Sequence, residues 1–231
     1  MKLLLLFFLS ALPRQEMLTY EVWLGPIHAG EMKLSLLETQ YKGQDAYRFR
    51  SVLYTKQSLS WLYRLHDTLY SYVAKDSFKL LYFEKRIHES NYDTVVRVRY
   101  DWNSSRILYE DGTSYPLIPG TLDLVSIYYY FRLNPLGVNE ERKITIHADR
   151  KTETSIVKGA QEVAVRSQAS PTGLFSCTKL VPEVTGKGSF GSRGKLLFYM
   201  TNDNNRYPAL IKTMMTLGSI TARLKRVWQK N

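Results

Sequence analysis

Apolar and polar residues alternate along most of this chain, and this alternation is what most limits how the chain can fold. Residues 18–24 alternate before the turn Gly25-Pro26, and residues 27–38 alternate again. A period of two places successive side chains on opposite faces of a β-strand. The pattern therefore predicts antiparallel hairpins with one buried face and one face in water.

The same pattern recurs along the sequence. It covers residues 47–53, 69–74, 78–89, 94–102, 142–149, 152–158, 160–167, 177–185, 195–202, 207–215 and 219–228. Asp111-Gly112 is a strong hairpin-turn signal. In residues 47–53 and 94–102 the polar positions include arginines, namely Arg48, Arg50, Arg97 and Arg99.

Residues 122–133 break the alternation, since most of their positions are apolar. Pro119-Gly120 ends the preceding element, and Pro135 stops the chain beyond the segment. We expect a helix over 122–133, and a helix that is apolar nearly all round should be buried. A strand is the alternative, because the segment is rich in β-forming residues. A weaker short helix is expected at 57–64.

A run of hairpins with one apolar face has to curl, or that face would meet water. We therefore expect a mainly β protein, with a strongly curved antiparallel sheet or incomplete barrel wrapped around one central helix at 122–133. A chain of 231 residues, 44% hydrophobic, can bury such a core. Because no linker or repeat interrupts residues 14–231, we expect one domain, with Gly186–Gly194 forming a hairpin or bend.

Residues 1–13 begin with Met-Lys and continue through an apolar run to Ser10, Ala11 and Pro13. This order is typical of a secretory signal peptide, and a buried first strand or helix is the alternative. We expect a periplasmic or otherwise exported protein, peripheral to a membrane if it contacts one. No other stretch is long and apolar enough to cross a bilayer.

Positive charge is in excess, with 32 Lys and Arg against 21 Asp and Glu and a formal net charge of +11. A basic exported protein is attracted to lipid head groups, lipopolysaccharide phosphates or acidic glycans. Export argues against nucleic acid as the partner. The alternative is that the charge only maintains solubility.

Several landmarks together resemble the bacterial "domain of unknown function 3108" family. They are Leu18–Gly30, Leu81–Ile87, Pro119–Arg132, Gly173–Leu180, Gly186–Lys195 and Pro208–Arg223, of which Pro119–Arg132 is the most specific. The resemblance covers about residues 17–228. It implies an exported, β-rich protein, and it implies no catalytic residues.

The sequence contains no convincing motif for binding a dinucleotide or a metal ion. Gly186–Gly191 matches G-x-G-x-x-G, but a strand rather than a helix follows it, so we expect no dinucleotide site. The four histidines have no metal-ligand spacing: they are His28, His66, His88 and His147. We expect no metal and no cofactor.

No nucleophile motif survives either. G-x-S-x-G is absent from the sequence, and the single Cys177 lies between apolar residues of an expected strand. A buried structural thiol is the favoured interpretation. We therefore expect no catalytic residue and no enzymatic activity.

Aromatic residues form the one cluster with functional promise. Trp61 and Tyr63, together with Tyr128 and Tyr129 on the expected helix, could line a cleft for an acyl chain or glycan. The alternative is an ordinary core, in which tyrosine supplies bulk.

Polar residues flank these tyrosines. Thr121 or Asp123 can cap the first turn of the expected helix. Arg132 could pair with a carboxylate from a strand, or it could hold the anionic head group of a ligand.

Three functions remain open. The first is a non-enzymatic exported envelope protein that binds a lipid or another hydrophobic or anionic component in an aromatic cleft. The second is a ligand-free structural or interaction module that holds a protein partner through strand edges or its basic tail. The third, with least support, is an envelope hydrolase.

Overall fold

The computed structural model describes residues 12–61, 63–183, 195–215 and 218–230. Most of the expected signal segment 1–13 lies outside these residues, as do the expected bend Gly186–Gly194 and its glycine motif.

Fifteen strands lie within the described residues and form one sheet. The first arm of the sheet holds β1 (Gln15–Leu24), β2 (Ile27–Tyr41), β3 (Gln44–Thr55), β4 (His66–Ala74), β5 (Leu80–Glu89), β6 (Tyr92–Asp101), β7 (Arg106–Tyr109) and β8 (Ser114–Pro116). The second arm holds β9 (Thr121–Leu122), β10 (Glu141–Ala148), β11 (Lys151–Arg166), β12 (Leu174–Glu183), β13 (Lys195–Thr201), β14 (Pro208–Met215) and β15 (Gly218–Lys230).

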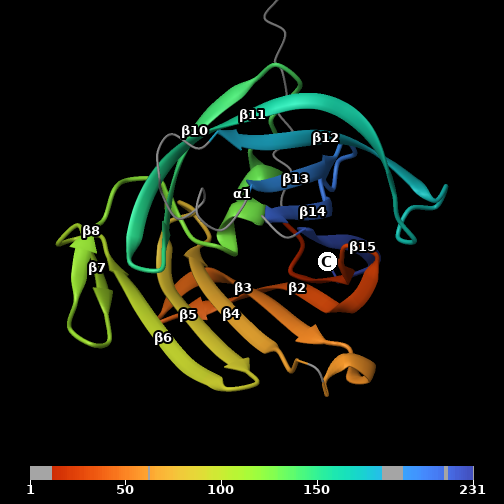
Figure 1. The fold of residues 1–231 in the computed structure, drawn as a ribbon. Coiled ribbons are helices and arrows are strands. Elements are labelled where there is room, and N and C mark those ends of the chain that lie inside the picture. Colours follow the sequence, from red (N-terminus) through yellow and green to blue (C-terminus); the bar gives the residue numbers. More distant parts are fainter. Residues whose placement is uncertain (1–11, 62, 184–194, 216–217, 231) are drawn as a thin grey trace, which may run out of the picture.

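The strand order of the sheet is β8-β7-β6-β5-β4-β3-β2-β1-β15-β14-β13-β12-β11-β10-β9. Each strand thus pairs with its neighbours in the chain, except that β1 pairs with β15 and β8 does not pair with β9. All pairs are antiparallel apart from the two-residue pairing of β9 with β10. Figure 1 shows the sheet as a strongly curved, unclosed surface, so the expectation of a mainly β protein with a curved antiparallel sheet is confirmed.

Some boundaries differ from those expected. The stretches 152–158 and 160–167 belong to one strand, β11, whose register shifts between Gly159 and Gln161. Such a bulge bends a strand without ending it. The expected helix at 57–64 is only the 3₁₀ turn η1 (Gln57–Leu59).

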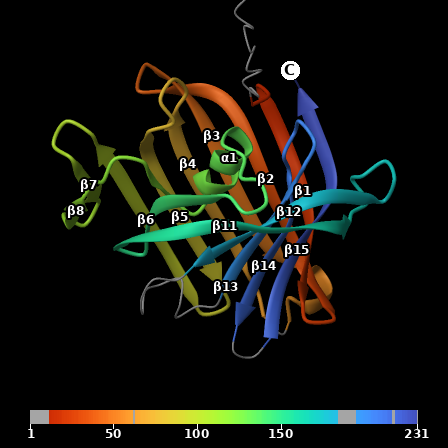
Figure 2. The ribbon, with the colours of Figure 1, turned by 90° about the horizontal axis from the view of Figure 1, so that it is seen from above.

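The one α-helix of the described residues is α1 (Ser126–Leu133). It begins four residues later than expected, because Thr121-Leu122 pair with β10 as β9. Figures 1 and 2 both place α1 on the inner side of the curved sheet.

Two clusters of buried side chains fill this inner side, and α1 contributes to both. Ile127 and Phe131 belong to the cluster that also contains Tyr20 and Phe198. Tyr129, which is also on α1, belongs to the second cluster, and most of that cluster comes from β3–β7. An isolated helix of eight residues is not stable in water. Burying one such side chain stabilises a fold by roughly 1.5–3 kcal/mol, so packing against the sheet stabilises α1.

Candidate functional site

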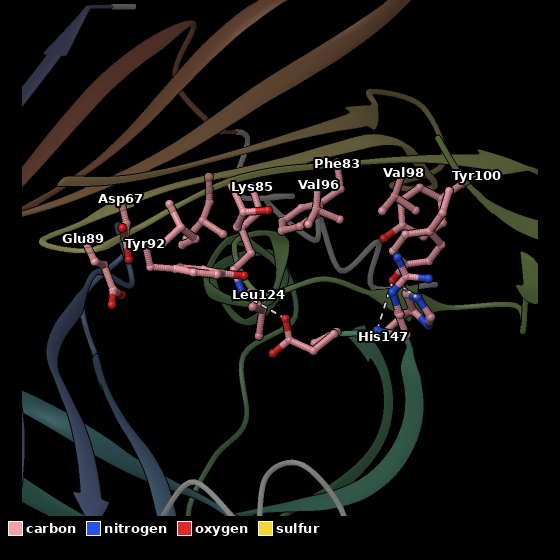
Figure 3. Close-up of a pocket in the computed structure, with 17 residues that line it drawn as sticks. Asp67, Phe83, Lys85, Glu89, Tyr92, Val96, Val98, Tyr100, Leu124 and His147 are labelled. Atoms are coloured by element: carbon pink, nitrogen blue, oxygen red, sulfur yellow. Dashed lines mark hydrogen bonds and ion pairs between the residues drawn. The ribbon is translucent and has the colours of Figure 1, made fainter. Parts of the chain in front are cut away.

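A pocket of about 560 Å³ lies between the inner face of β4–β6 and the turn that joins β10 to β11 (Figure 3). Its middle is apolar and is formed by Leu69, Phe83, Ile87, Val96, Val98 and Leu124. Alternation along β5 and β6 brings these side chains to one face, since Phe83 pairs with Val98 and Lys85 with Val96. The size lies within the range of small-ligand pockets.

The two ends of the pocket differ in chemistry. Figure 3 shows Asp67, Glu89 and Tyr92 at one end and Tyr100 and His147 at the other. Burial raises the pKa of Asp67 above its usual value. Glu89 accepts a hydrogen bond from the Tyr63 hydroxyl. The acidic end is therefore polar and partly desolvated.

A lysine crosses the pocket. Lys85 Nζ on β5 lies 2.8 Å from Asp149 Oδ1 on the β10–β11 turn. Asp149 and Arg150 both have positive φ angles, 47° and 66°, as a tight two-residue hairpin requires. This ion pair connects the two arms of the sheet across the apolar floor.

The same turn is anchored at the other end of the pocket. The Arg150 guanidinium lies 4.8 Å from the centre of the Tyr109 ring and forms an ion pair with Asp111. Its backbone N–H donates to Tyr109 Oη at 3.1 Å. These contacts fix the turn over the ends of β7 and β8.

His147 lies in this anchor and is 3% exposed. Its Nε2 is 2.7 Å from Tyr109 Oη, and its Nδ1 is 2.8 Å from Thr152 Oγ1. Since Tyr109 Oη already accepts from Arg150, we assign its proton to a bond with Nε2, which leaves Nδ1–H to donate to Thr152. Burial lowers the pKa of His147 to about 4. The ring is therefore neutral near pH 7, with both nitrogens occupied.

The described residues that line the pocket include no cysteine. Across the described ranges, no three His, Cys, Asp or Glu side chains lie close enough to hold a metal ion. Cys177 is fully buried on β12, and burial raises the pKa of its thiol to about 12. What the pocket offers is shape, an apolar floor and polar ends.

None of the five residues expected to bind a ligand lines this pocket. Trp61 is 81% exposed and Tyr63 is 45% exposed, next to η1. Tyr63 borders a separate apolar groove of about 280 Å³ near Leu24 and Ile27. These two aromatics therefore lie apart from the helix.

Tyr128 and Tyr129 pack in the interior. The Tyr129 ring stacks on Phe49 with 4.0 Å between ring centres and 7° between planes. Tyr128 meets Phe198 edge to face at 5.5 Å. The structure thus places both tyrosines in core contacts.

Arg132 is 3% exposed and is held on every side. It forms a bidentate ion pair with Glu16 of β1, one bond being 2.9 Å from Nη2 to Oε2. Its Nε donates to the carbonyl of Asn205 at 3.0 Å. Of the two partners considered from the sequence, a strand carboxylate and a ligand head group, the carboxylate occupies the guanidinium here.

The residues expected as caps lie just ahead of α1. Asp123 Oδ1 accepts from the N–H groups of Val125 and Ser126, at 2.9 and 2.8 Å, and Oδ2 accepts from Ser71 Oγ at 2.6 Å. Thr121 Oγ1 donates to the carbonyl of Ile118 at 2.7 Å. Asp123 therefore joins the start of the helix to β4.

Sequence reasoning missed the residues of the pocket. Alternation placed Phe83, Val96 and Val98 on a buried face, but it gave no sign that part of this face stays open. The signal that was available is Asp149-Arg150, a turn pair followed by a long strand.

Comparison with known proteins gives one family. The model of the family described as "Protein of unknown function (DUF3108)" matches residues 19–225. None of the curated proteins is detectably similar to the chain. In the part of the chain that the structure describes, no helix has the length and apolar character needed to span a membrane.

Two matches were found among solved structures. A β-barrel-like protein of the domain of unknown function DUF1849 from Brucella abortus is 9% identical, with a TM-score of 0.62 over 96% of this chain and 99% of that one. The hypothetical protein CT021 from Chlamydia trachomatis is 8% identical, with a TM-score of 0.40 over 96% of this chain and 89% of that one. The first likeness establishes a shared β-barrel-like fold.

Proposed function

We propose that this chain, which belongs to the DUF3108 family, is a non-enzymatic envelope protein. In this proposal it binds a lipid or another hydrophobic molecule in the pocket between β4–β6 and the β10–β11 turn. The supporting observation is the pocket itself. Part of its apolar floor, at Leu69, Ile87 and Val96, stays accessible between the two arms of the sheet, and an accessible apolar surface in a folded protein is a candidate for ligand binding.

The fit to an amphiphile follows from the distribution of polarity. An acyl chain or a similar apolar body would lie on Leu69, Ile87 and Val96, the partly exposed apolar side chains of the pocket wall. Polar groups of the ligand would meet Asp67 and Glu89 at one end, or the His147 end at the other. Lys85 and Asp149 would sit above the ligand as a removable strap, because a partly exposed ion pair is worth only about 0–1 kcal/mol.

The compartment is part of this proposal. The positive start and apolar run of residues 1–13 support export, and the net charge of +11 supports an anionic environment. An envelope lipid would be available to such a protein.

A ligand-free structural or interaction module is the second candidate. The observation that favours it is the close packing of α1, where Tyr129 stacks on Phe49 with 4.0 Å between ring centres. In this function the pocket would hold only water, and protein partners would be recognised at the sheet edges.

Filling the pocket separates the two functions. Val96→Trp would place an indole on the apolar floor, whereas Val95→Trp would place one on the outer face of the same strand, where Val95 is 47% exposed. Binding of cis-parinaric acid, followed by its fluorescence, should be lost in Val96→Trp and retained in Val95→Trp.

Native mass spectrometry of protein purified from membranes supplies the second readout. We expect a co-purified lipid on the wild type and on Val95→Trp, and none on Val96→Trp. A wild-type protein that carries no lipid and binds no cis-parinaric acid would contradict the proposal and favour the ligand-free module.

A further inference from the structure

Arginine and tyrosine side chains gather on the outer face of β3–β6, opposite the core. The core side of these strands carries Phe49, Ser71, Phe83 and Val98. Residues one position away therefore point outward. The outward residues of interest, which we call the arginine–tyrosine face, are Arg48, Arg50, Tyr70, Tyr72, Tyr82, Arg86, Arg97 and Arg99.

Strand register arranges these residues in two rows across the sheet. One row runs Arg48–Tyr72–Tyr82–Arg99, and the adjacent row runs Arg50–Tyr70–Glu84–Arg97. Each row crosses three strand spacings, or about 14 Å, and the two rows lie about 7 Å apart. Figure 1 shows β3–β6 side by side in the curved arm that carries them.

Positive charge is only partly balanced on this face. Glu84 pairs with Arg86 and Arg97, and Arg97 also pairs with Glu110 at 2.7 Å. Within the described parts of the chain, Arg48, Arg50 and Arg99 form no ion pair with a carboxylate. Three guanidinium groups are therefore available to an external anion.

One tyrosine of this face, Tyr70, holds two guanidinium groups in place. Arg50 and Arg86 lie over the Tyr70 ring, at 5.5 and 5.8 Å from its centre. Arg50 Nε is buried and has no hydrogen-bond acceptor within the described residues.

We propose that the arginine–tyrosine face binds a flexible polyanion of the acidic or phosphorylated polysaccharide class. Guanidinium groups match carboxylate and phosphate oxygens in bidentate geometry, and rows of them suit a polymer with repeated anionic groups. Because the arm is strongly curved, a flexible polymer can follow its surface, whereas a flat bilayer would contact only part of it. This site is independent of the inner pocket, since it lies on the other side of the same strands.

The test uses the triple variant Arg48→Gln/Arg50→Gln/Arg99→Gln. The matched control is Lys143→Gln/Lys151→Gln/Arg226→Gln, which removes the same charge from exposed positions on β10, β11 and β15. Heparin serves as the anionic probe and uncharged dextran as the negative probe, with binding measured by isothermal titration calorimetry at several salt concentrations. Circular dichroism checks that both variants are folded.

We expect wild type to bind heparin but not dextran. The arginine variant should lose affinity about ten-fold or more, and the slope of log K against log salt should fall by roughly three units, one for each lost cation. The control should stay within about three-fold of wild type, since it removes only distant charge.

Equal losses in the two variants would overturn the proposal, because net charge alone would then explain binding. No heparin binding by wild type would overturn it as well. Tighter binding of a single-stranded oligothymidine or of phosphatidylglycerol vesicles than of heparin, lost in the arginine variant, would replace the polysaccharide with nucleic acid or a membrane.

Discussion

Arg132 of α1 and Glu16 of β1 form a bidentate ion pair inside the core, although they lie 116 positions apart in the sequence. Glu16 is 1% exposed and Arg132 is 3% exposed. Gln229 of β15 also donates to Glu16 Oε2 at 2.7 Å. The pair therefore connects the helix to the two strands at the centre of the sheet.

Breaking this pair from one side should be strongly destabilising. Glu16→Met or Arg132→Met would leave a buried charge without its partner, at a cost of about 3–5 kcal/mol in the free energy of unfolding. The double variant should cost less than the sum of the two, because it removes both charges. Urea denaturation of all four proteins gives the coupling energy.

The surface pair Lys158–Glu141, at 2.8 Å, is the control for this cycle. Glu141→Gln should change the free energy of unfolding by about 1 kcal/mol or less. An additive result for the core pair would contradict the account of Arg132 and Glu16 as a coupled unit.

Asp123 should matter through its hydrogen bonds. Asp123→Ala would leave the N–H groups of Val125 and Ser126 and the Ser71 hydroxyl without an acceptor, and we expect a loss of about 3 kcal/mol or more. Asp123→Asn keeps one acceptor oxygen for the two N–H groups and should cost less. Thermal and urea unfolding would show an equal loss in both variants if the side chain only fills space.

The pH dependence of Asp123 has a defined sign. Burial raises the pKa of Asp123, so the folded state takes up its proton at higher pH than the unfolded state does. Its contribution to stability is fully present below the unfolded pKa and is lost as pH rises through the folded pKa. Asp123→Asn should lack this change, which urea titrations across the acidic range would detect.

His147 should act in the opposite direction. Its pKa is lowered to about 4, so the unfolded chain binds the proton first as pH falls. Stability should be complete above about pH 6.5 and decline by up to about 3 kcal/mol as pH falls toward 4. His147→Gln, which can keep both hydrogen bonds, should flatten this part of the unfolding profile. An unchanged profile would mean that the histidine titrates normally.

Gly30 should not tolerate a side chain. The Cβ of Gly30→Ala would lie 2.2 Å from the carbonyl oxygen of Tyr54, so β2 and β3 would have to separate. Overpacking of this kind costs about 1–3 kcal/mol or more. Gly137→Ala, whose nearest contact is a Glu140 side chain at 3.4 Å, is the matched control and should unfold at nearly the wild-type temperature.

Much of the fold could be predicted from the alternation of apolar and polar residues, because a sheet with one buried and one solvent-exposed face requires that pattern. The pairing of β1 with β15 could not, since nothing in either strand specifies a partner about 200 positions away in the sequence. The start of the helix was misplaced because Thr121-Leu122 are also good strand residues, and the nearby β10 provides a partner.

The site was harder to predict than the fold. The sequence suggested Tyr128 and Tyr129 as ligand-binding residues, but in the structure their rings pack against Phe198 and Phe49 in the core. The pocket depends on where the Asp149-Arg150 turn reaches β5 through Lys85, a contact between residues 64 apart. Local patterns specify the faces of strands, but only the tertiary fold determines which part of a face stays uncovered.

The pairing of β1 with β15 has a consequence for how the molecule is made. Each arm consists largely of neighbouring hairpins that can form as the chain emerges, but the seam between the arms has to wait until residues 218–230 are available. Until then β1 presents an unpaired edge, the situation in which a nascent chain most needs a chaperone.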